Sequence, residues 1–370
     1  MSPLPRLRHA AIYFAKLTFM NILFSLLALL VGLPGMALAG AVTIMPGAVW
    51  PDDRGQHVQA HGGGITKVGD TWYWFGEDRG RTNAPGRRYV GCYASHDLAY
   101  WTFRHQVVQA EDPAGLGPGW ILERPKVYHN ELTHQFVMYA HIDDRAYKVA
   151  SVAVFTCATV DGDYQYVKRF RPLGHESRDI GQFVDDDGTA YLIFEDRPFG
   201  FRIARLAADY LSVESEMCLV PKHMEGGAVF HLNGLYYVLG SNLTGWNPNP
   251  NTYATATSLR GPWSEFKDLA PHALNTYGAQ STLAVKITGS AATNVIFMGD
   301  IWRPRSQWDS RYLWMPLQID GAKVALPPPA PWTLDVATGM VKNLKFQNSK
   351  ILKGDILLGM KEKTVQGGRD

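Results

Sequence analysis

The prediction of the fold depends on the stretch Asp187-Gly188-Thr189-Ala190-Tyr191-Leu192-Ile193-Phe194. Its Asp-Gly pair favours a tight turn, and the aromatic and aliphatic residues that follow are typical of the second strand of a β-hairpin. A turn followed by a strand-like run recurs at residues 69–75, 133–139, 233–239 and 293–298. The spacing of about 45 to 65 residues matches a four-stranded propeller blade with its loops.

A second set of short apolar runs precedes these stretches, and each run follows a polar residue. Such runs are expected for the innermost strand of each blade. We therefore predict an all-β protein with one five-bladed β-propeller over residues 40–326. Innermost strands of a propeller run parallel to one another, so residues at equivalent starts should converge at one end of the channel. These residues are His61, Glu123, Asp179, Glu225 and Gln280.

Three of the converging residues are carboxylic acids, which suggests glycosidic chemistry. Cleavage of a glycosidic bond without a metal needs one protonated carboxyl group for the leaving oxygen and a second group that positions water or a nucleophile. Mutual repulsion and partial burial should raise the pKa of at least one of the three carboxyl groups. The alternative is that each residue forms a local ion pair, for example Glu123 with Arg124 or Asp179 with Arg178.

Composition and charge argue against several other functions. The 36 basic and 34 acidic residues are scattered and give a net charge of +2, so no site for nucleic acid is predicted. The expected partner is a neutral polysaccharide or oligosaccharide. Aromatic residues make up 12% of the chain, and their flat faces could bind sugar rings or simply fill strands. No Gly-x-Ser-x-Gly sequence occurs, which argues against an esterase.

No cofactor and no essential metal are predicted. The run Asp185-Asp186-Asp187-Gly188 could form a calcium loop, but adjacent aspartates before a glycine are more typical of a solvated hairpin turn. The histidines are not spaced as a ligand set, and the 3 cysteines fit neither a zinc motif nor a disulfide framework.

The two ends of the chain differ from the rest. Residues 1–39 combine a basic start, a short apolar run at 22–31 and Ala37-Leu38-Ala39, which predicts a cleaved signal peptide and a secreted or periplasmic protein without stable membrane insertion. An uncleaved membrane anchor is the alternative. Residues 311–319 are expected to supply the closing strand of the propeller, and residues 327–370 to form a Pro-rich segment and a Lys-rich tail.

Several phrases of the sequence occur together in one known family. They are His61-Gly62-Gly63-Gly64-Ile65, Trp74-Phe75-Gly76-Glu77, Glu123-Arg124-Pro125-Lys126-Val127, Ser177-Arg178-Asp179, Glu225-Gly226-Gly227-Ala228, Thr244-Gly245-Trp246 and Tyr277-Gly278-Ala279-Gln280-Ser281-Thr282. Across roughly residues 45–320 the chain resembles glycoside hydrolase family 43, and within it the group of exo-β-1,3-galactanases. The resemblance implies a five-bladed propeller that inverts the anomeric centre.

The resemblance also implies roles for individual residues. Glu225 occupies the position of the general acid, and Asp179 that of the carboxylate which orients the acid and tunes its pKa. The aspartate that serves most of the family as base is missing, because His61 and glycines stand there. Gln280 resembles a glutamine that holds the attacking water, as an amide or as its imidic acid tautomer. Glu123 and Glu77 resemble residues that bind sugar hydroxyls, although Glu123 could be the base instead.

The remaining candidates for contact with substrate are His61, Tyr147, Asn242, Thr244, Trp246 and Trp302. The tryptophans could stack on sugar or shield the rims of the blades. We predict an inverting, exo-acting galactan 1,3-β-galactosidase that works as a monomer on arabinogalactan-type polysaccharide. The alternatives are an α-L-arabinofuranosidase or β-galactofuranosidase of the same family, or a non-catalytic carbohydrate-binding propeller.

Overall fold

The computed structural model describes residues 40–344. The predicted signal peptide lies outside the described residues, and so do residues 345–370 of the predicted tail. Strands dominate the described part, whose helices are three short 3₁₀ segments, η1 (Pro172–Gly174), η2 (His272–Gly278) and η3 (Gln307–Asp309). The predicted all-β class is confirmed. Within residues 40–344 no helix is long and apolar enough to cross a membrane.

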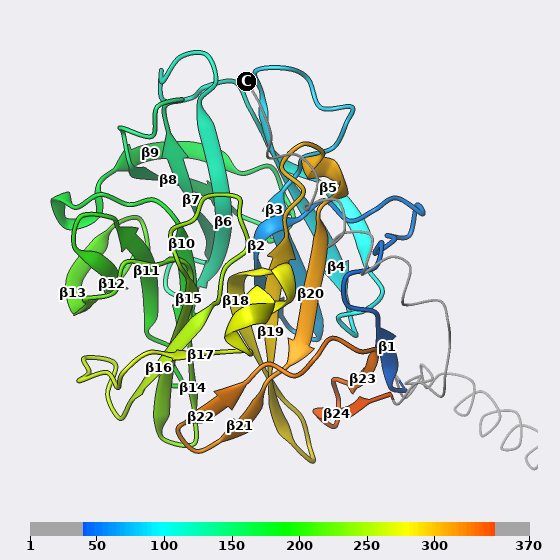
Figure 1. Ribbon diagram of the computed structural model, residues 1–370. Helices are drawn as coiled ribbons and strands as arrows, with labels where there is room; N and C mark the ends of the chain where they lie inside the picture. The colour runs from blue at the N-terminus through cyan, green and yellow to red at the C-terminus, as the bar shows by residue number, and fades with distance from the viewer. Residues whose placement is uncertain (1–39, 345–370) are drawn as a thin grey trace, which may run out of the picture. The chain divides into compact units, whose positions relative to one another are not determined.

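Most strands belong to antiparallel sheets built from strands that are consecutive in the chain (Figure 1). Four of these sheets have four strands each. The first contains β2 (His61–Val68), β3 (Thr71–Glu77), β4 (Arg88–Ser95) and β5 (Thr102–Ala110). The second contains β6 (Ile121–Asn130), β7 (Gln135–Asp143), β8 (Ser151–Cys157) and β9 (Gln165–Phe170). The third contains β10 (Ile180–Val184), β11 (Ala190–Asp196), β12 (Gly200–Leu206) and β13 (Val213–Val220).

The next two sheets complete this series. The fourth contains β14 (Glu225–Leu232), β15 (Leu235–Ser241), β16 (Thr252–Ala256) and β17 (Lys267–Asp268). The last has three strands, β18 (Gln280–Thr288), β19 (Thr293–Ile301) and β20 (Arg311–Pro316). First strands contact one another in the order β2, β6, β10, β14, β18 and back to β2. The predicted hairpin arms correspond to the second strands β3, β7, β11, β15 and β19.

Two smaller sheets involve the end of the described chain. β21 (Gln318–Asp320) pairs with β22 (Lys323–Ala325), and β23 (Trp332–Asp335) lies between β1 (Val42–Ile44) and β24 (Met340–Asn343). The Trp332 ring is fully buried, and its Nε1 donates to the carbonyl of Trp314 over 2.8 Å. Ordered strands therefore continue past the expected boundary at Leu326, because these short segments add apolar surface to the core of the first and last sheets.

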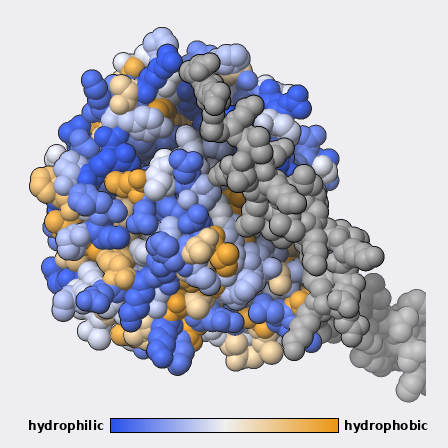
Figure 2. Space-filling model, in the orientation of Figure 1, coloured by the Kyte–Doolittle hydropathy of each residue, from blue (hydrophilic) through white to orange (hydrophobic). Residues whose placement is uncertain are grey.

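The core lies between neighbouring sheets and contains large aromatic side chains. Trp74, Trp101 and Trp314 are nearly fully buried. Trp101 packs edge to face against the other two rings, and Trp74 and Trp314 are tilted by 53° to each other. The face shown in Figure 2 is mostly hydrophilic, with apolar residues scattered in small groups. Many of the aromatic residues therefore fill the core between strands, which was one of the two roles that the composition suggested for them.

Candidate active site

The predicted convergence is found at one end of the first strands. Each predicted residue lies opposite a polar residue at the end of the second strand of its sheet. For Asp179, which directly precedes β10, the backbone carbonyl accepts from the N–H of Glu195 over 2.9 Å. The cross-strand pairs are His61 with Glu77, Glu123 with His141, Asp179 with Glu195, Glu225 with Ser241, and Gln280 with Asp300.

A β-bulge with a left-handed residue directs several of these side chains. The register shifts after His61, Glu123 and Glu225. The residue that follows each of them has a positive φ, which is 57° at Gly62, 53° at Arg124 and 61° at Gly226. A Cβ on Gly226 would lie 2.4 Å from the carbonyl oxygen of Ser281, so glycine is required there for space as well as conformation. Arg124 adopts the same conformation at a cost of roughly 1 to 2 kcal/mol.

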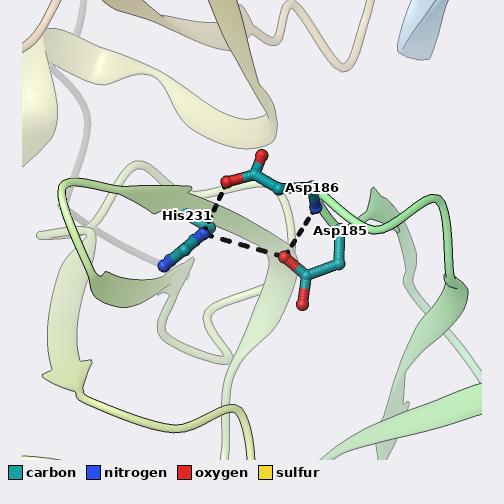
Figure 3. Close-up of side chains that lie close together, drawn as sticks. All are labelled: Asp185, Asp186 and His231. Carbon is teal, nitrogen blue, oxygen red and sulfur yellow. Dashed lines mark hydrogen bonds and ion pairs between the residues drawn. The ribbon is translucent and has the colours of Figure 1, made fainter.

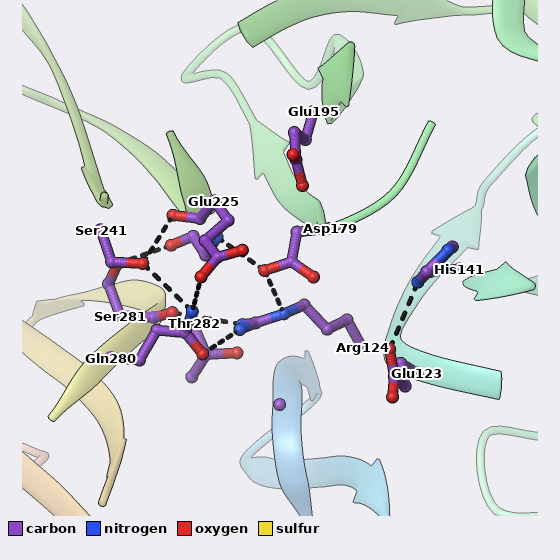
Figure 4. Close-up of polar contacts among 12 residues, drawn as sticks. Glu123, Arg124, His141, Asp179, Glu195, Glu225, Ser241, Gln280, Ser281 and Thr282 are labelled. Carbon is purple, nitrogen blue, oxygen red and sulfur yellow. Dashed lines mark hydrogen bonds and ion pairs between the residues drawn. The ribbon is translucent and has the colours of Figure 1, made fainter. Parts of the chain in front are cut away.

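Glu225 has the environment of a protonated acid. Glu225 is 8% exposed, and its Oε1 accepts a hydrogen bond from Nε2 of Gln280 over 3.0 Å (Figure 4). Burial and the nearby charges of Asp179 and Glu195 raise the pKa of Glu225 to about 8, against the opposing effect of Arg124 and Arg197. Oε2 of Glu225 meets a more distant donor, Nη2 of Arg197 at 3.5 Å. Because the shorter contact from Gln280 occupies Oε1, we place the proton of the neutral acid on Oε2.

The amide of Gln280 uses all of its hydrogen-bonding capacity. Its Oε1 accepts from Arg124 Nη2 over 2.6 Å and from Trp302 Nε1 over 2.8 Å. Its Nε2 donates to Glu225 and, over 3.1 Å, to the hydroxyl of Ser241. An imidic acid tautomer would place an O–H group against two N–H donors, so these contacts favour the ordinary amide.

Asp179 contacts residues next to both Glu225 and Gln280. Its Oδ2 accepts from the N–H of Gly226 over 2.8 Å and pairs with Nε of Arg124 at 2.8 Å. Carboxylate oxygens of Asp179, Glu195 and Glu225 all lie within 4.8 Å of one another. Glu195 is almost fully buried, and its Oε2 lacks a hydrogen-bond partner among the described residues. The close negative charges explain why protonation of Glu225 is favourable.

Glu123 and Glu77 lie on the other side of Arg124. Burial opposes ionisation of Glu123, but an ion pair with Nδ1 of His141 at 3.4 Å and the charge of Arg79 outweigh it, and the pKa of Glu123 falls to about 2. Tyr147 donates to the same carboxylate over 3.4 Å. Glu77 pairs with Arg79, accepts from the N–H of Arg124 over 3.0 Å, and has a raised pKa because it is buried. An ionised and a buried carboxyl group therefore face the site together.

His61 is placed differently from its prediction as a substrate-binding residue. It is fully buried, stacks on Tyr312 with ring centroids 5.0 Å apart, and lies beside Trp302. Its Nδ1 is 3.3 Å from Oδ1 of Asp300. A side chain covered in this way cannot touch a sugar, and the geometry gives His61 a supporting position under Trp302 instead.

The predicted sugar contacts from the β15–β16 loop divide into two kinds. Trp246 is 43% exposed and meets Trp302 edge to face at 5.2 Å. Both rings line a small pocket with Gln280, Ser241 and Asn249. The side chains of Asn242 and Thr244 bond instead to the backbone of Pro250 and Asn247, at 3.2 and 2.5 Å. Asn242 and Thr244 thus shape the loop, while Trp246 and Trp302 face the space next to Gln280.

The predicted solvated turn at Asp185 connects β10 and β11, with the N–H of Gly188 donating to the carbonyl of Asp185 over 2.9 Å. Asp186 lies 2.8 Å from Nδ1 of His231 (Figure 3). Asp185 accepts from the hydroxyl of Tyr236 over 2.8 Å. Lys286 forms an ion pair with Asp186. The two aspartates therefore have donors from the chain itself.

Glu195, Arg124 and Asp300 are members of the site that the sequence patterns did not predict. One pattern could have revealed Glu195, because Glu195-Asp196-Arg197 repeats Glu77-Asp78-Arg79 at the end of another second strand. In both cases the arginine pairs with the glutamate two residues before it. Arg124 and Asp300 are found only once strand register is known.

Comparison with known proteins agrees with this geometry. Residues 60–290 match the profile of glycosyl hydrolases family 43. A crystal structure of an exo-β-1,3-galactanase from Phanerochaete chrysosporium with β-1,3-galactotriose is 37% identical, with a TM-score of 0.76 over 82% of this chain and 71% of that one. An exo-β-1,3-galactanase from Clostridium thermocellum is 33% identical, with a TM-score of 0.74 over 82% of this chain and 68% of that one.

No curated protein sequence matches the chain. The match to the family nevertheless extends over more than half of the sequence and includes Glu123, Asp179, Glu225 and Gln280. The solved relatives cover most of the described residues at more than 30% identity. The chain therefore belongs to glycosyl hydrolases family 43 and is a glycosidase.

Proposed function

We propose that the protein is a secreted, monomeric exo-β-1,3-galactanase whose five consecutive sheets are the blades of a five-bladed propeller. The cyclic contacts of β2, β6, β10, β14 and β18 support the propeller. Relatives named as exo-β-1,3-galactanases and crystallised with galactotriose or galactose support the substrate. The leader-like composition of residues 1–39 supports export.

The observation that carries the proposal is the state of Glu225. A carboxyl group with a pKa of about 8 is protonated at neutral pH and can give its proton to the leaving oxygen. In this scheme Oε2 of Glu225 protonates the glycosidic oxygen while the C1–O bond breaks. Asp179 keeps the acid oriented through Gly226 and maintains its high pKa.

We assign binding of sugar hydroxyls to Glu123, Glu77 and Tyr147. Gln280 places the attacking water in this scheme by giving up its contact with Ser241 when the sugar enters, because all four of its hydrogen bonds are otherwise used. Glu123 is ionised, and carboxylates are strong acceptors for hydroxyl donors. Trp246 and Trp302 supply aromatic faces next to Gln280, where an apolar face of a sugar can pack. Water attacks C1 on the face opposite to the leaving group and inverts the anomeric centre. The proton that this water loses passes to an ionised carboxylate, and we assign this role to Glu123.

The test uses β-1,3-galactotriose labelled at its reducing end. We expect single galactose units to be released from the other end, so that the first labelled product is the disaccharide. In ¹H NMR of the early reaction the released galactose should be the α anomer, because a β linkage has been inverted. Aryl α-L-arabinofuranoside and β-galactofuranoside serve as comparison substrates. Faster hydrolysis of either, or initial release of the β anomer, would contradict the proposal.

A further inference from the structure

Arg124 holds a backbone conformation that its neighbours in the fold reserve for glycine. The equivalent bulge residues after His61 and Glu225 are Gly62 and Gly226, with φ values of 57° and 61°. Arg124 has a φ of 53° and is 4% exposed. A long charged residue in a strained and buried position points to a function for its side chain.

We infer that Arg124 is a positioning residue that fixes the amide orientation of Gln280 and thereby the side of Glu225 that carries the catalytic proton. This role rests on the proposed function of Glu225 as general acid. Arg124 does not itself touch the reacting atoms, because its guanidinium is enclosed by protein groups.

The guanidinium of Arg124 fixes the orientation of the Gln280 amide through three contacts. Nε of Arg124 pairs with Asp179 at 2.8 Å, and Nη2 donates to Oε1 of Gln280 over 2.6 Å. Nη1 donates to the carbonyl of Ser281, the residue after Gln280, over 3.2 Å. Arg124 therefore binds both the backbone and the side chain at the start of β18. A flipped amide would turn its NH₂ group toward the donors of Arg124 and Trp302, which is unfavourable.

The orientation of the Gln280 amide in turn determines which oxygen of Glu225 accepts a hydrogen bond from it. With Oε1 of Gln280 held by Arg124 and Trp302, Nε2 has to face Oε1 of Glu225, which is 3.0 Å away. Oε1 of Glu225 then accepts the shorter hydrogen bond, while Oε2 meets only Nη2 of Arg197 at 3.5 Å, so the acid keeps its proton on Oε2. The planar fork of arginine can bond Asp179 and Gln280 at fixed angles, whereas a lysine ammonium could replace only one contact at a time.

The experiment compares R124K and R124G with wild type in the hydrolysis of β-1,3-galactotriose. We expect kcat to fall about 100-fold in both variants, because a misplaced catalytic group costs this much. KM should stay within about threefold of wild type, since Arg124 contacts no substrate. R124G suits the left-handed backbone and should fold, which near-UV circular dichroism checks. The matched control is R104G, because Arg104 pairs with Asp161 at the surface.

A second measurement separates positioning from a merely structural role. Methylguanidinium should restore at least about tenfold of the lost kcat in R124G but not in R104G, because it can occupy the vacated space. A kcat of R124K within threefold of wild type, or loss confined to KM, would overturn the inference.

Hydrogen exchange of the Gln280 side chain tests the role of Arg124 without any substrate, so it can be judged separately from the proposed activity. With ¹⁵N-labelled glutamine, the side-chain NH₂ signals of Gln280 should exchange with solvent at least about tenfold faster in R124G than in wild type. Failure of wild type to cleave galactotriose would sink the proposed substrate alone. Unchanged exchange in R124G would sink the inference about Arg124.

Discussion

Nε2 of Gln280 donates to Oε1 of Glu225 over 3.0 Å, so the neutral amide and the buried acid form one unit. The amide oxygen is held from the other side by Trp302 and Arg124. The orientation of the acid therefore depends on residues of several sheets, and each can be changed separately.

Replacement of Glu225 by glutamine tests the acid directly. In E225Q, kcat should fall at least about 100-fold, because general acid catalysis typically contributes that much. The melting temperature should not decrease, since the change removes a carboxyl group from the vicinity of Asp179 and Glu195. Steady-state kinetics and calorimetry measure the two effects. A variant that retains a tenth of the wild-type kcat would contradict the assignment.

The pH profile of kcat/KM should report the pKa of Glu225. Because the acid must be protonated, activity should fall as the pH rises above about 8. In E195Q a negative charge near Glu225 is lost, which lowers the pKa of Glu225 and moves the alkaline limb to lower pH. The control is E214Q, because Glu214 is exposed and pairs with Arg205. An alkaline limb that stays in place in E195Q speaks against the electrostatic coupling.

His141 should stabilise the fold in a defined pH window. Burial disfavours its charge, but a hydrogen bond to Asp143 and an ion pair with Glu123 raise the pKa of His141 from 6.5 to about 9. This contribution is complete below pH 6.5 and disappears as the pH rises through about 9. The pKa of Glu123 is lowered from 4.5 to about 2, so its contribution is complete above pH 4.5 and disappears toward pH 2.

The H141Q variant should consequently lose most stability between pH 4.5 and 6.5, where both contributions are present. The expected loss is about 3 kcal/mol, as for a broken buried ion pair. Denaturant unfolding at several pH values measures it, with H96Q at an exposed histidine as the control. A loss that does not change with pH would show that packing, and not charge, is responsible.

The two tryptophans near Gln280 should affect different kinetic constants. W302F removes the Nε1 donor to Gln280, and we expect kcat to fall about tenfold with little change in KM. W246A removes a half-exposed ring from the pocket next to Gln280, and KM should rise about tenfold. Both variants are compared on galactotriose. If W246A changes neither constant, Trp246 only shields the edge of the sheet.

Trp332 tests whether the structured domain extends beyond Leu326. Its ring is fully buried, so W332A should lower the free energy of unfolding by about 3 to 5 kcal/mol. The control W308A concerns a ring that is 39% exposed and should cost no more than about 0.5 kcal/mol. Equal effects of the two variants in urea unfolding would place Trp332 outside the cooperative unit.

Sequence patterns were sufficient to predict the repeating sheets and the gathering of Glu123, Asp179, Glu225 and Gln280. The reason is that a turn, an alternating strand and a polar start are local signals, and their recurrence places equivalent residues at the same end. The pairing of β1 with β23 has no such signal, because strands of three and four residues show no periodicity.

The details of the site depend on contacts that no local pattern encodes. His61 was expected to bind sugar, but Tyr312 of β20 and Trp302, which follows β19, cover it. Glu195 belongs to the site because the register of β10 and β11 places it opposite Asp179. Arg124 was quoted as part of a motif, yet its role follows from a left-handed bulge that only the backbone conformation reveals.

The pairing of β1 with β23 has a consequence for protein synthesis. Val42 lies opposite Leu334, so the first strand leaves the ribosome long before its partner has been translated. Contacts between such distant segments also form slowly, because the entropy of closing the intervening loop opposes them. The sheet that joins the two ends of the described residues can therefore be completed only after residues 332–335 have been made.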